Sequence, residues 1–405
     1  MKFIEGGVCA PKGFKASGLH VGVKTSNANK KDLALIVSDK DCSAAAVYTK
    51  NVVKAAPLHV TKENLKNGKA RAVFANSGNA NACAPNGEAH AQSMCKSMAK
   101  ELGINEDEVI VASTGVIGQE LPINVVESGV AELCSQLSYD GSEDAAAAIM
   151  TTDLTMKELA IEFEIEGKSV KIGGIAKGSG MIHPNMGTML AFVTTDCAIS
   201  PAMIQKALVN ATNVSFNRVT VDGDSSTNDM LTVLANGLAG NSEITKEGEA
   251  FDKFSEVLNT LCIELAKMIA ADGEGATHLI TCNVQGAKDE AQAEQLSKSV
   301  ISSSLVKAAM FGADANWGRV LCAMGYSGVD FDPDGVDVSF ASSAGCIDVC
   351  KSGRGLLFDE DIAKKILSEH DISIDIAISE GTATCTCWGC DLTYDYVRIN
   401  GDYRS

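Results

Sequence analysis

Strand pairing within one short segment limits the possible folds of this chain more than any other feature. Residues 158–175 alternate apolar and polar side chains on both sides of Glu166-Gly167-Lys168, a pattern typical of two antiparallel strands joined by a tight turn. Segments of helical period lie before and after this hairpin. They cover residues 87–102, 250–270 and 288–309, and a stretch from Pro122 to about Leu137. Because hairpin strands and helices are mixed along the chain, we expect an α/β fold of the mixed α+β kind and not a purely parallel sheet.

The length of the chain adds a second constraint. At 405 residues it exceeds the size at which one hydrophobic core normally keeps growing. Further strands are expected at 189–195, 371–378 and 381–387, and Ser200-Pro201 predicts the start of a helix directly after the first of them. No tandem repeat or obvious linker separates the two halves. We therefore expect a two-lobed layered sandwich in which mixed sheets are flanked by helices.

Composition excludes several classes of function. The chain has 34 Lys and Arg against 52 Asp and Glu, a net charge of −18, and no basic cluster interleaved with aromatic residues. Phosphate-backbone binding requires the opposite charge balance, so no nucleic-acid partner is expected. The N-terminus lacks the apolar stretch of a signal peptide, and no apolar run approaches the ~20 residues that span a bilayer. A cytoplasmic small-molecule enzyme or protein-binding module with no membrane partner remains.

The cysteines raise the question of a metal site. Fourteen of them are scattered without a repeating framework, which in a long cytoplasmic chain indicates reduced thiols. Cys385, Cys387 and Cys390 lie close together, and three thiolates could bind zinc. Their spacing departs from the usual ligand pattern, however, and no histidine is near in sequence. Alternation in a strand explains Cys385 and Cys387 equally well, so we expect no metal.

One junction carries a chemical possibility. The stretch KGSGMIHPNMGTMLAFVTTD at 177–196 places Gly187-Thr188 just ahead of a strand-like apolar run. A simple loop would explain it. Alternatively, Thr188 is a nucleophile, because a threonine at a chain N-terminus uses its own α-amine as the base for its hydroxyl. That chemistry requires a cut before Thr188, which the hydroxyl makes by attacking the carbonyl of Gly187. The amide then shifts to an ester, and water releases the new amine.

The residues around this junction resemble a known signature. The run from Lys177 to Leu190 is similar to the self-cleavage segment of the ornithine acetyltransferases, also called glutamate N-acetyltransferases, of arginine biosynthesis. The similarity extends in the same order along nearly the whole chain. Its other motifs are APKGF near the N-terminus, VYTKNVVKAAP at 47–57, NSGNANAC at 76–83, STGVIG at 113–118, MTTDLTMK at 150–157, VDGDSSTND at 221–229, DGEGATH at 272–278, GADANWGR at 312–319 and WGCDLTYDYVRINGDYRS at the C-terminus. The family usually has alanine where this chain has Gly187, which should affect the efficiency of cleavage more than cleavage itself.

The resemblance implies roles for four residues. Thr188 would be the nucleophile for both self-cleavage and acetyl transfer. Thr114 and Gly115 would form the oxyanion hole, through the hydroxyl of one and the backbone N–H of the other. Glu274 would lie near the reacting amines, where a carboxylate holds a substrate ammonium or moves its proton. A plain turn and a solvated loop glutamate are the alternative interpretations of these residues.

The resemblance also implies a substrate-binding set. It comprises Thr151 or Thr152, Lys177, Thr188, Glu274, Asn400 and Ser405. N-acetylornithine and glutamate both carry an α-carboxylate, so one cation with a few hydroxyl and amide donors can orient either. An ordinary surface position is the alternative for Lys177. The family often ends in threonine where this chain has Ser405, and the hydroxyl is kept.

The expected product of self-cleavage is a pair of interlocked fragments. Residues 1–187 would carry the oxyanion hole and Lys177, and residues 188–405 would begin with the nucleophile Thr188. The resemblance implies a heterotetramer of two fragments of each kind. It implies a ping-pong reaction in which the acetyl group passes from N-acetylornithine to Thr188 and then to glutamate. No cofactor is needed because the acetyl group is recycled, although some family members also accept acetyl-CoA as donor.

Three other interpretations stay open. A self-cleaving amidohydrolase or aminopeptidase of the same design would pass the acyl group to water. The segment GGIAKGSG could cradle phosphate in a nucleotide-binding module, although it lacks the usual glycine spacings. Asp222, Asp224 and Asp229 could bind a divalent cation, although a structural turn near the site explains that stretch better.

Overall fold

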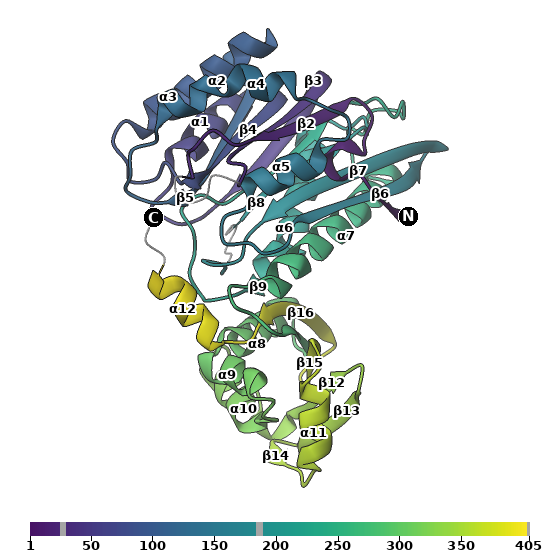
Figure 1. The fold of residues 1–405 in the computed structure, drawn as a ribbon. Helices are drawn as coiled ribbons and strands as arrows, with labels where there is room; N and C mark the ends of the chain where they lie inside the picture. The colour runs from purple at the N-terminus through teal and green to yellow at the C-terminus, as the bar shows by residue number, and fades with distance from the viewer. Residues whose placement is uncertain (25–29, 184–188, 403–405) are drawn as a thin grey trace.

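The computed structural model describes residues 1–24, 30–183 and 189–402. Two β-sheets form two lobes, with the first drawn above the second in Figure 1. The first sheet has the strand order β1-β6-β7-β8-β10-β3-β4-β5, with β2 also paired to β3. The second has the order β14-β13-β12-β15-β11-β16-β9. The expected architecture of two lobes with mixed sheets flanked by helices is confirmed.

The first sheet combines antiparallel and parallel pairs. Strand β8 pairs parallel with β10, and β4 pairs parallel with β5, whereas the other pairs in this sheet are antiparallel. Its strands are β1 Lys2–Ile4, β2 Phe14–Leu19, β3 Leu33–Tyr48, β4 Lys69–Asn79, β5 Val109–Val116, β6 Lys157–Ile165, β7 Lys168–Lys177, β8 Leu190–Thr195 and β10 Met230–Ala235.

Helices cover both faces of the first sheet. Helices α6 and α7 pack against each other and against its strands, and α5 packs against β2, β3 and β7. Helices α1 and α2 pack beside β5, α4 packs against β2 and β3, and α3 packs against α2 and α4. The helices are α1 Ala56–Asn64, α2 Gly87–Leu102, α3 Ile123–Ser128, α4 Val130–Ser135, α5 Ser142–Ile149, α6 Pro201–Val214 and α7 Glu249–Ala271.

The second sheet packs mainly against α8, which covers β11 and β16. Its strands are β9 Val219–Thr220, β11 Leu279–Ala287, β12 Asp337–Ser342, β13 Gly345–Lys351, β14 Arg354–Gly355, β15 Asp371–Ala377 and β16 Ala383–Cys390. The accompanying helices are α8 Glu290–Ser302, α9 Ser304–Phe311, α10 Trp317–Gly325, α11 Glu360–Leu367 and α12 Tyr394–Asp402. Short 3-10 turns lie at Gly7–Cys9, Leu65–Asn67, Glu106–Glu108, Phe216–Arg218 and Pro333–Gly335.

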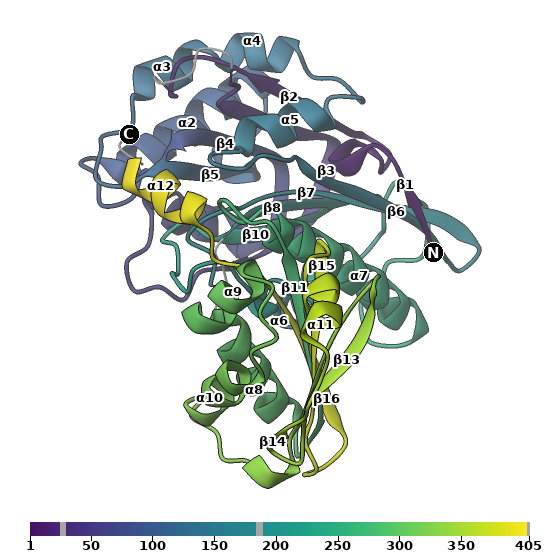
Figure 2. The same ribbon diagram turned by 60° about the horizontal axis from the view of Figure 1, so that its bottom comes forward.

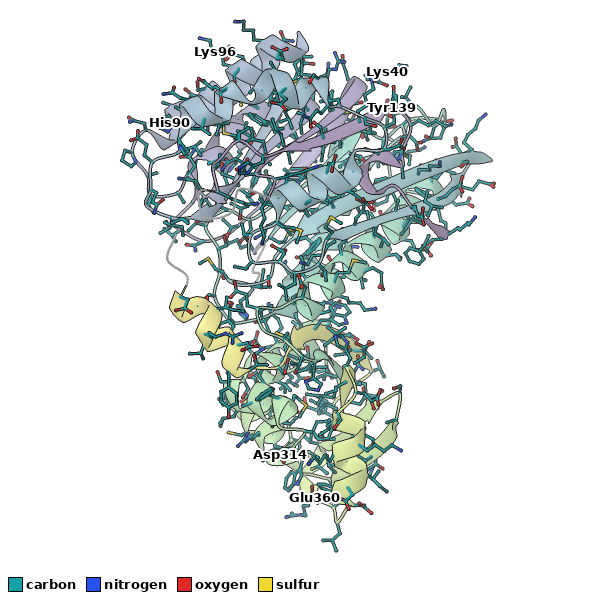
Figure 3. The ribbon with its side chains drawn as sticks, viewed as in Figure 1. Lys40, His90, Lys96, Tyr139, Asp314 and Glu360 are labelled. Carbon is teal, nitrogen blue, oxygen red and sulfur yellow. The ribbon has the colours of Figure 1, made fainter. Side chains whose placement is uncertain are left out.

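The last helix connects the two lobes. Figures 1 and 2 both show α12 running from the second lobe towards the end of the first sheet where β5 lies. Charged residues occupy the far ends of the molecule, as Lys96 on α2 and Glu360 on α11 illustrate in Figure 3. None of the helices within the described ranges combines the length and the apolar character needed to cross a bilayer.

The hairpin expected at 158–175 is present. Strands β6 and β7 pair antiparallel, with Ile165 opposite Lys168. The two turn residues, Glu166 and Gly167, have φ values of 52° and 73°. Positive φ at both central positions is the turn geometry that matches the twist of two paired strands.

Two of the expected helices are each divided in the structure. The stretch after Pro122 forms α3 and α4, which meet at Gly129, where an added Cβ would lie 2.4 Å from the Val21 side chain. The stretch at 288–309 forms α8 and α9, which meet at Ser303. The hydroxyl of Ser303 accepts a hydrogen bond from the backbone N–H of Val306 and caps the second helix. Helical periodicity continues across such breaks, so the pattern alone does not reveal them.

The cysteine cluster belongs to a strand. Cys385 and Cys387 lie in β16 and are buried, and Cys387 stands opposite Cys282 of β11. In the ranges that the structure describes, no group of three or more His, Cys, Asp or Glu side chains is arranged to hold a metal ion. Core packing explains the burial of these thiols.

Helix α7 provides the stability prediction for the fold. Phe254 on this helix has an exposed fraction of 0% and belongs to the hydrophobic core beneath the first sheet, whereas Phe3 is 52% exposed. We expect Phe254→Ala to lower the free energy of unfolding by about 3–5 kcal/mol, because it removes a buried ring and leaves a cavity. Urea titration measures this loss. Phe3→Ala is the matched control, and an equal loss in both variants would contradict the assignment of α7 to the core.

Candidate active site

A pocket of about 310 Å³ lies where the end of the first sheet meets α12. Residues from seven separate parts of the chain line it. They are Thr114, Gly115, Val116, Ile117, Thr151, Thr152, Lys177, Gly180, Met181, Met189, Leu190, Ser226, Asn228, Asp229, Glu274 and Asn400. Seven of these were predicted from sequence as site residues: Thr114, Gly115, Thr151, Thr152, Lys177, Glu274 and Asn400. The other three predicted positions, Gly187, Thr188 and Ser405, lie outside the described residues.

Thr114 and Gly115 reach the pocket from the end of β5. Gly115 has a φ of 131° and packs against β4 so closely that an added Cβ would lie 2.4 Å from the carbonyl carbon of Gly78. Only glycine fits there. Asn228 holds Ser113, the residue before Thr114. Its side-chain amide donates a hydrogen bond to the carbonyl of Ser113 at 2.8 Å. The strand end that carries Thr114 is therefore fixed from both sides.

Lys177 is the cation that faces the pocket from the end of β7. Its side chain is only 10% exposed, and its Nζ donates to the Thr151 hydroxyl at 2.8 Å. The same Nζ lies 3.8 Å from Oδ2 of Asp153. A buried lysine with one hydroxyl and one distant carboxylate keeps donor capacity for an anionic ligand. The alternative of an ordinary surface position is wrong. Of the two threonines considered, Thr151 is the one that contacts this lysine.

A buried group of three charges supports that lysine. The Nζ of Lys157 donates to Oδ1 of Asp153 at 2.8 Å and to Oδ2 of Asp272 at 2.5 Å, and the Lys157 side chain is fully buried. The Asp153 carboxylate also accepts the backbone N–H groups of Thr151 at 2.9 Å and Gly178 at 2.7 Å. We call Asp153, Lys157 and Asp272 the buried ion group.

The buried ion group determines the charge of Asp153. Burial alone would raise the pKa of this carboxyl, but the charges of Lys177 and Lys157 outweigh it and hold the pKa well below its usual range. Asp153 is therefore a carboxylate at neutral pH. Sequence analysis named its neighbours Thr151 and Thr152 and missed Asp153, although a lysine at the start of a buried strand is a signal that a carboxylate must lie nearby.

Glu274 also lines the pocket, from the loop after α7. Its side chain accepts a hydrogen bond from Nδ2 of Asn400 at 2.7 Å, and its backbone N–H donates to the carbonyl of Ser179 at 3.0 Å. Gly180 lies directly against the carboxylate, since an added Cβ would be 2.3 Å from Oε2. The absence of a side chain at Gly180 leaves the space that the Glu274 carboxylate occupies. The carboxylate is buried rather than solvated.

The acidic stretch at 221–229 divides into two parts. Asp222 accepts the backbone N–H groups of Met181 at 2.6 Å and Ile182 at 2.9 Å, so it closes the loop that follows β7. This is the structural turn that the sequence favoured. Asp229 instead lies on the pocket wall and is 1% exposed. Sequence analysis grouped the two together and did not single out Asp229.

The nucleotide-binding interpretation of GGIAKGSG is wrong. Gly173 and Gly174 lie inside β7, paired with β6 on one side and β8 on the other. Their backbone N–H groups belong to the sheet and do not form an open loop around a phosphate.

Comparisons with known proteins match this chain over nearly its whole length. A model of the ArgJ family matches residues 15–405. The arginine biosynthesis bifunctional protein ArgJ of Caldanaerobacter subterraneus subsp. tengcongensis is 49% identical over 406 residues, with 100% of both chains covered. Its counterpart from Symbiobacterium thermophilum is 50% identical, again with 100% of both chains covered. A crystal structure of arginine biosynthesis bifunctional protein argJ from Bacillus halodurans is 46% identical and covers 53% of this chain and 100% of its own, with a TM-score of 0.51.

The chain belongs to the ArgJ family, the bifunctional ornithine acetyltransferases of arginine biosynthesis. The resemblance drawn from the ordered motifs is thereby confirmed.

The buried ion group yields a stability prediction. We expect Asp153→Asn to lower the free energy of unfolding at pH 7 by about 3 kcal/mol, because it leaves buried lysine charge without its partner. The folded pKa of Asp153 is depressed, so its contribution is fully present above the ordinary carboxyl pKa and is lost as pH falls through the folded value. The difference between wild type and variant in urea titrations should therefore begin to shrink only below about pH 4, and should close as pH falls further towards the depressed folded pKa. Asp348→Asn, an exposed position, is the control and should change stability little at either pH.

Proposed function

We propose that this ArgJ-family enzyme transfers an acetyl group from N-acetylornithine to glutamate through an acetyl-Thr188 intermediate, after cutting itself between Gly187 and Thr188. One observation carries the proposal. A single pocket gathers the threonine-glycine strand end, the lysine, the carboxylate and the C-terminal asparagine that the family resemblance implied. These residues come from both sides of the proposed cut.

Substrate orientation follows from the charges in the pocket. Lys177 binds the α-carboxylate that both substrates share, helped by the Thr151 hydroxyl that it already contacts at 2.8 Å. Glu274, held by Asn400, binds the amino group of the substrate or moves its proton. A volume of about 310 Å³ suits one acylated amino acid. The two substrates therefore take turns in one site, as a ping-pong reaction requires.

Acyl transfer then proceeds in two balanced halves. The Thr188 hydroxyl attacks the acetyl carbonyl, its proton passes to the α-amine of the same residue, and the amine of ornithine leaves with that proton. Thr114 and Gly115 donate hydrogen bonds to the oxyanion of each tetrahedral intermediate. The amine of glutamate then attacks the ester carbonyl, its proton passes through the α-amine of Thr188 to the Thr188 oxygen as the ester C–O bond breaks, and N-acetylglutamate leaves. Acetyl-CoA remains a second proposed donor, since the relatives are named bifunctional proteins.

Sheet pairing supports the proposed cut. Lys177 at the end of β7 stands opposite Leu190 at the start of β8, so the junction lies in the loop between two paired strands. The solved chain from Bacillus halodurans is covered in full by 53% of this chain, about the share that residues 188–405 represent. We propose that the fragments 1–187 and 188–405 stay interlocked after cleavage and assemble as a heterotetramer of two of each.

Intact mass spectrometry tests the nucleophile. We expect wild type to appear as two fragments, 1–187 and 188–405, and Thr188→Ala as one uncut and inactive chain. N-acetylornithine without acceptor should add one acetyl group to the second fragment, and glutamate should remove it. Thr245→Ala, at an exposed position of the same fragment, is the control and should behave as wild type. An acetyl group on the 1–187 fragment would refute the role of Thr188, and acetate release in place of transfer would favour the amidohydrolase.

The contact between Gly180 and Glu274 gives a second test. Gly180→Ala places a methyl group against the Glu274 carboxylate, which must move away from Asn400. Because only the end of a flexible side chain has to yield, we expect little loss of stability but a fall in kcat/KM of at least about 10-fold, the equivalent of one hydrogen bond to a charged group. In a Glu274→Ala background the same glycine substitution should cause no further loss. Additive losses would show that Gly180 acts by another route.

A further inference from the structure

Asp229 is a buried acid in the pocket wall that the reaction described above does not use. It is 1% exposed and lies immediately before β10. Its Oδ2 atom has no hydrogen-bond partner among the residues that the structure describes. An ionised carboxylate with an unpartnered buried oxygen is expensive, whereas the protonated acid is not. The position therefore favours the neutral form.

The surroundings of Asp229 agree with that form. Burial raises its pKa well above the usual carboxyl range, and the nearby Ser226, Thr49 and the charge of Lys177 oppose the rise only in part. Lys177 and Glu274 are the charged side chains that line the pocket with it. The contrast with Asp153 is direct, because that carboxyl contacts a lysine and two backbone N–H groups and stays ionised. When two neighbouring aspartates have pKa values shifted in opposite directions, the ionised one typically supplies charge and the neutral one typically donates or accepts a proton.

Strand register places Asp229 beside Met189, the residue that follows Thr188 in the sequence. Strands β8 and β10 pair parallel with Leu190 opposite Met230, and the backbone N–H of Met230 donates to the carbonyl of Met189 at 3.0 Å. Asp229 thus stands beside Met189, whose backbone N–H is among the groups that act on its carboxyl. Met189 is joined by one peptide bond to Thr188. The neighbouring Asn228 holds Ser113, the residue before Thr114.

We propose that Asp229 carries the proton in the self-cleavage step, and this inference rests on the proposed cut between Gly187 and Thr188. The Thr188 hydroxyl oxygen forms a bond to the carbonyl carbon of Gly187, and the bond from that carbon to the Thr188 nitrogen breaks. The hydroxyl must lose one proton and the nitrogen must gain one. The neutral acid gives its proton to the nitrogen from one oxygen and accepts the hydroxyl proton on the other, so it ends unchanged. Water then hydrolyses the ester without further demand on Asp229.

This role explains why an acid should stay neutral in a site that already has a carboxylate. In the uncut chain the Thr188 nitrogen is an amide and cannot serve as a base. An ionised carboxylate could accept the hydroxyl proton but would have none to give to the leaving nitrogen at the start. A buried neutral acid can do both. Once the chain is cut, the new α-amine takes over as the base for acetyl transfer.

The test is the rate of self-cleavage of freshly made full-length chain, followed by intact mass spectrometry. Asp229→Asn keeps the shape and loses the exchangeable acid proton, and we expect it to slow cleavage by about 10²- to 10⁴-fold. Hydroxylamine, which cleaves esters, should not restore the rate, because the block precedes the ester. Asp224→Asn, an exposed position on the same loop, is the matched control and should cleave at the wild-type rate. Cleavage of Asp229→Asn at the wild-type rate would overturn the proposal.

The pH profile of the wild-type chain gives a readout that a purely structural role would not move. Cleavage should slow as pH rises through the raised pKa of Asp229, because the neutral acid is then lost. A rate that holds steady or rises over that range would overturn the proposal even if the variant failed to fold. The Thr188→Ala chain separates this idea from the proposed function. If the Thr188→Ala chain still cuts, or if wild type never cuts, the proposed function itself is wrong. If only Asp229→Asn cuts at the normal rate, the role of Asp229 is refuted and the proposed function stands.

Discussion

The buried ion pairs of Lys157 are the interaction on which the site depends. Lys157 is the first residue of β6, Asp153 lies in the loop before it, and Asp272 directly follows the last residue of α7. Removing one partner would leave a buried charge uncompensated, which costs far more than the pair contributes on its own. The ion pairs therefore hold the end of α7 against the stretch that leads into β6, close to Lys177 and Glu274.

The same arrangement separates the electrostatic roles within the pocket. Lys177 keeps a free donor because Asp153, its nearest carboxylate, is occupied mainly by Lys157 and by backbone N–H groups. Glu274 lines the same pocket, and its hydrogen-bond partner is the neutral side-chain amide of Asn400 on α12. A zwitterionic amino acid matches this pattern, because its carboxylate faces the cation and its amine faces the carboxylate. Under the proposed function, this charge geometry would orient the amino-acid part of the substrate before any contact with the acyl group is made.

Much of the fold followed from local patterns. The helix at 87–102 and the hairpin at 158–175 were predicted correctly because amphipathic periodicity and a two-residue turn are local properties. The breaks at Gly129 and Ser303 were not predicted, since they depend on a tertiary contact with Val21 and on a serine cap inside a continuous apolar pattern. Strand order was out of reach as well. Nothing in a single sequence says that β10 lies between β8 and β3.

Site residues divide along a similar line. Thr114, Lys177, Glu274 and Asn400 were named from motifs, and the structure brings all four to one pocket. Asp153 was not named, and Asp229 was considered only as part of a possible cation site, although both lie inside motifs that had been quoted. Asp153 is important because of the lysines that surround it in the fold. Asp229 is important because one of its buried carboxyl oxygens has no hydrogen-bond partner among the described residues. A carboxylate in a motif does not disclose its protonation state, because burial and neighbouring charge are properties of the folded chain.

The position of the junction within the first sheet explains how one chain could become two without losing its site. The two sheets do not divide at residue 188, because β8 and β10 belong to the first sheet together with the strands that precede the junction. A cut in the loop between β7 and β8 leaves Lys177 paired with Leu190, and β10 stays hydrogen-bonded to β3. Helix α7 also packs on β6 and β7 from the other side of the cut. Separation of the proposed fragments would expose this sheet and its core, so the hydrophobic effect that folds the chain would also hold the two fragments together after the proposed cut.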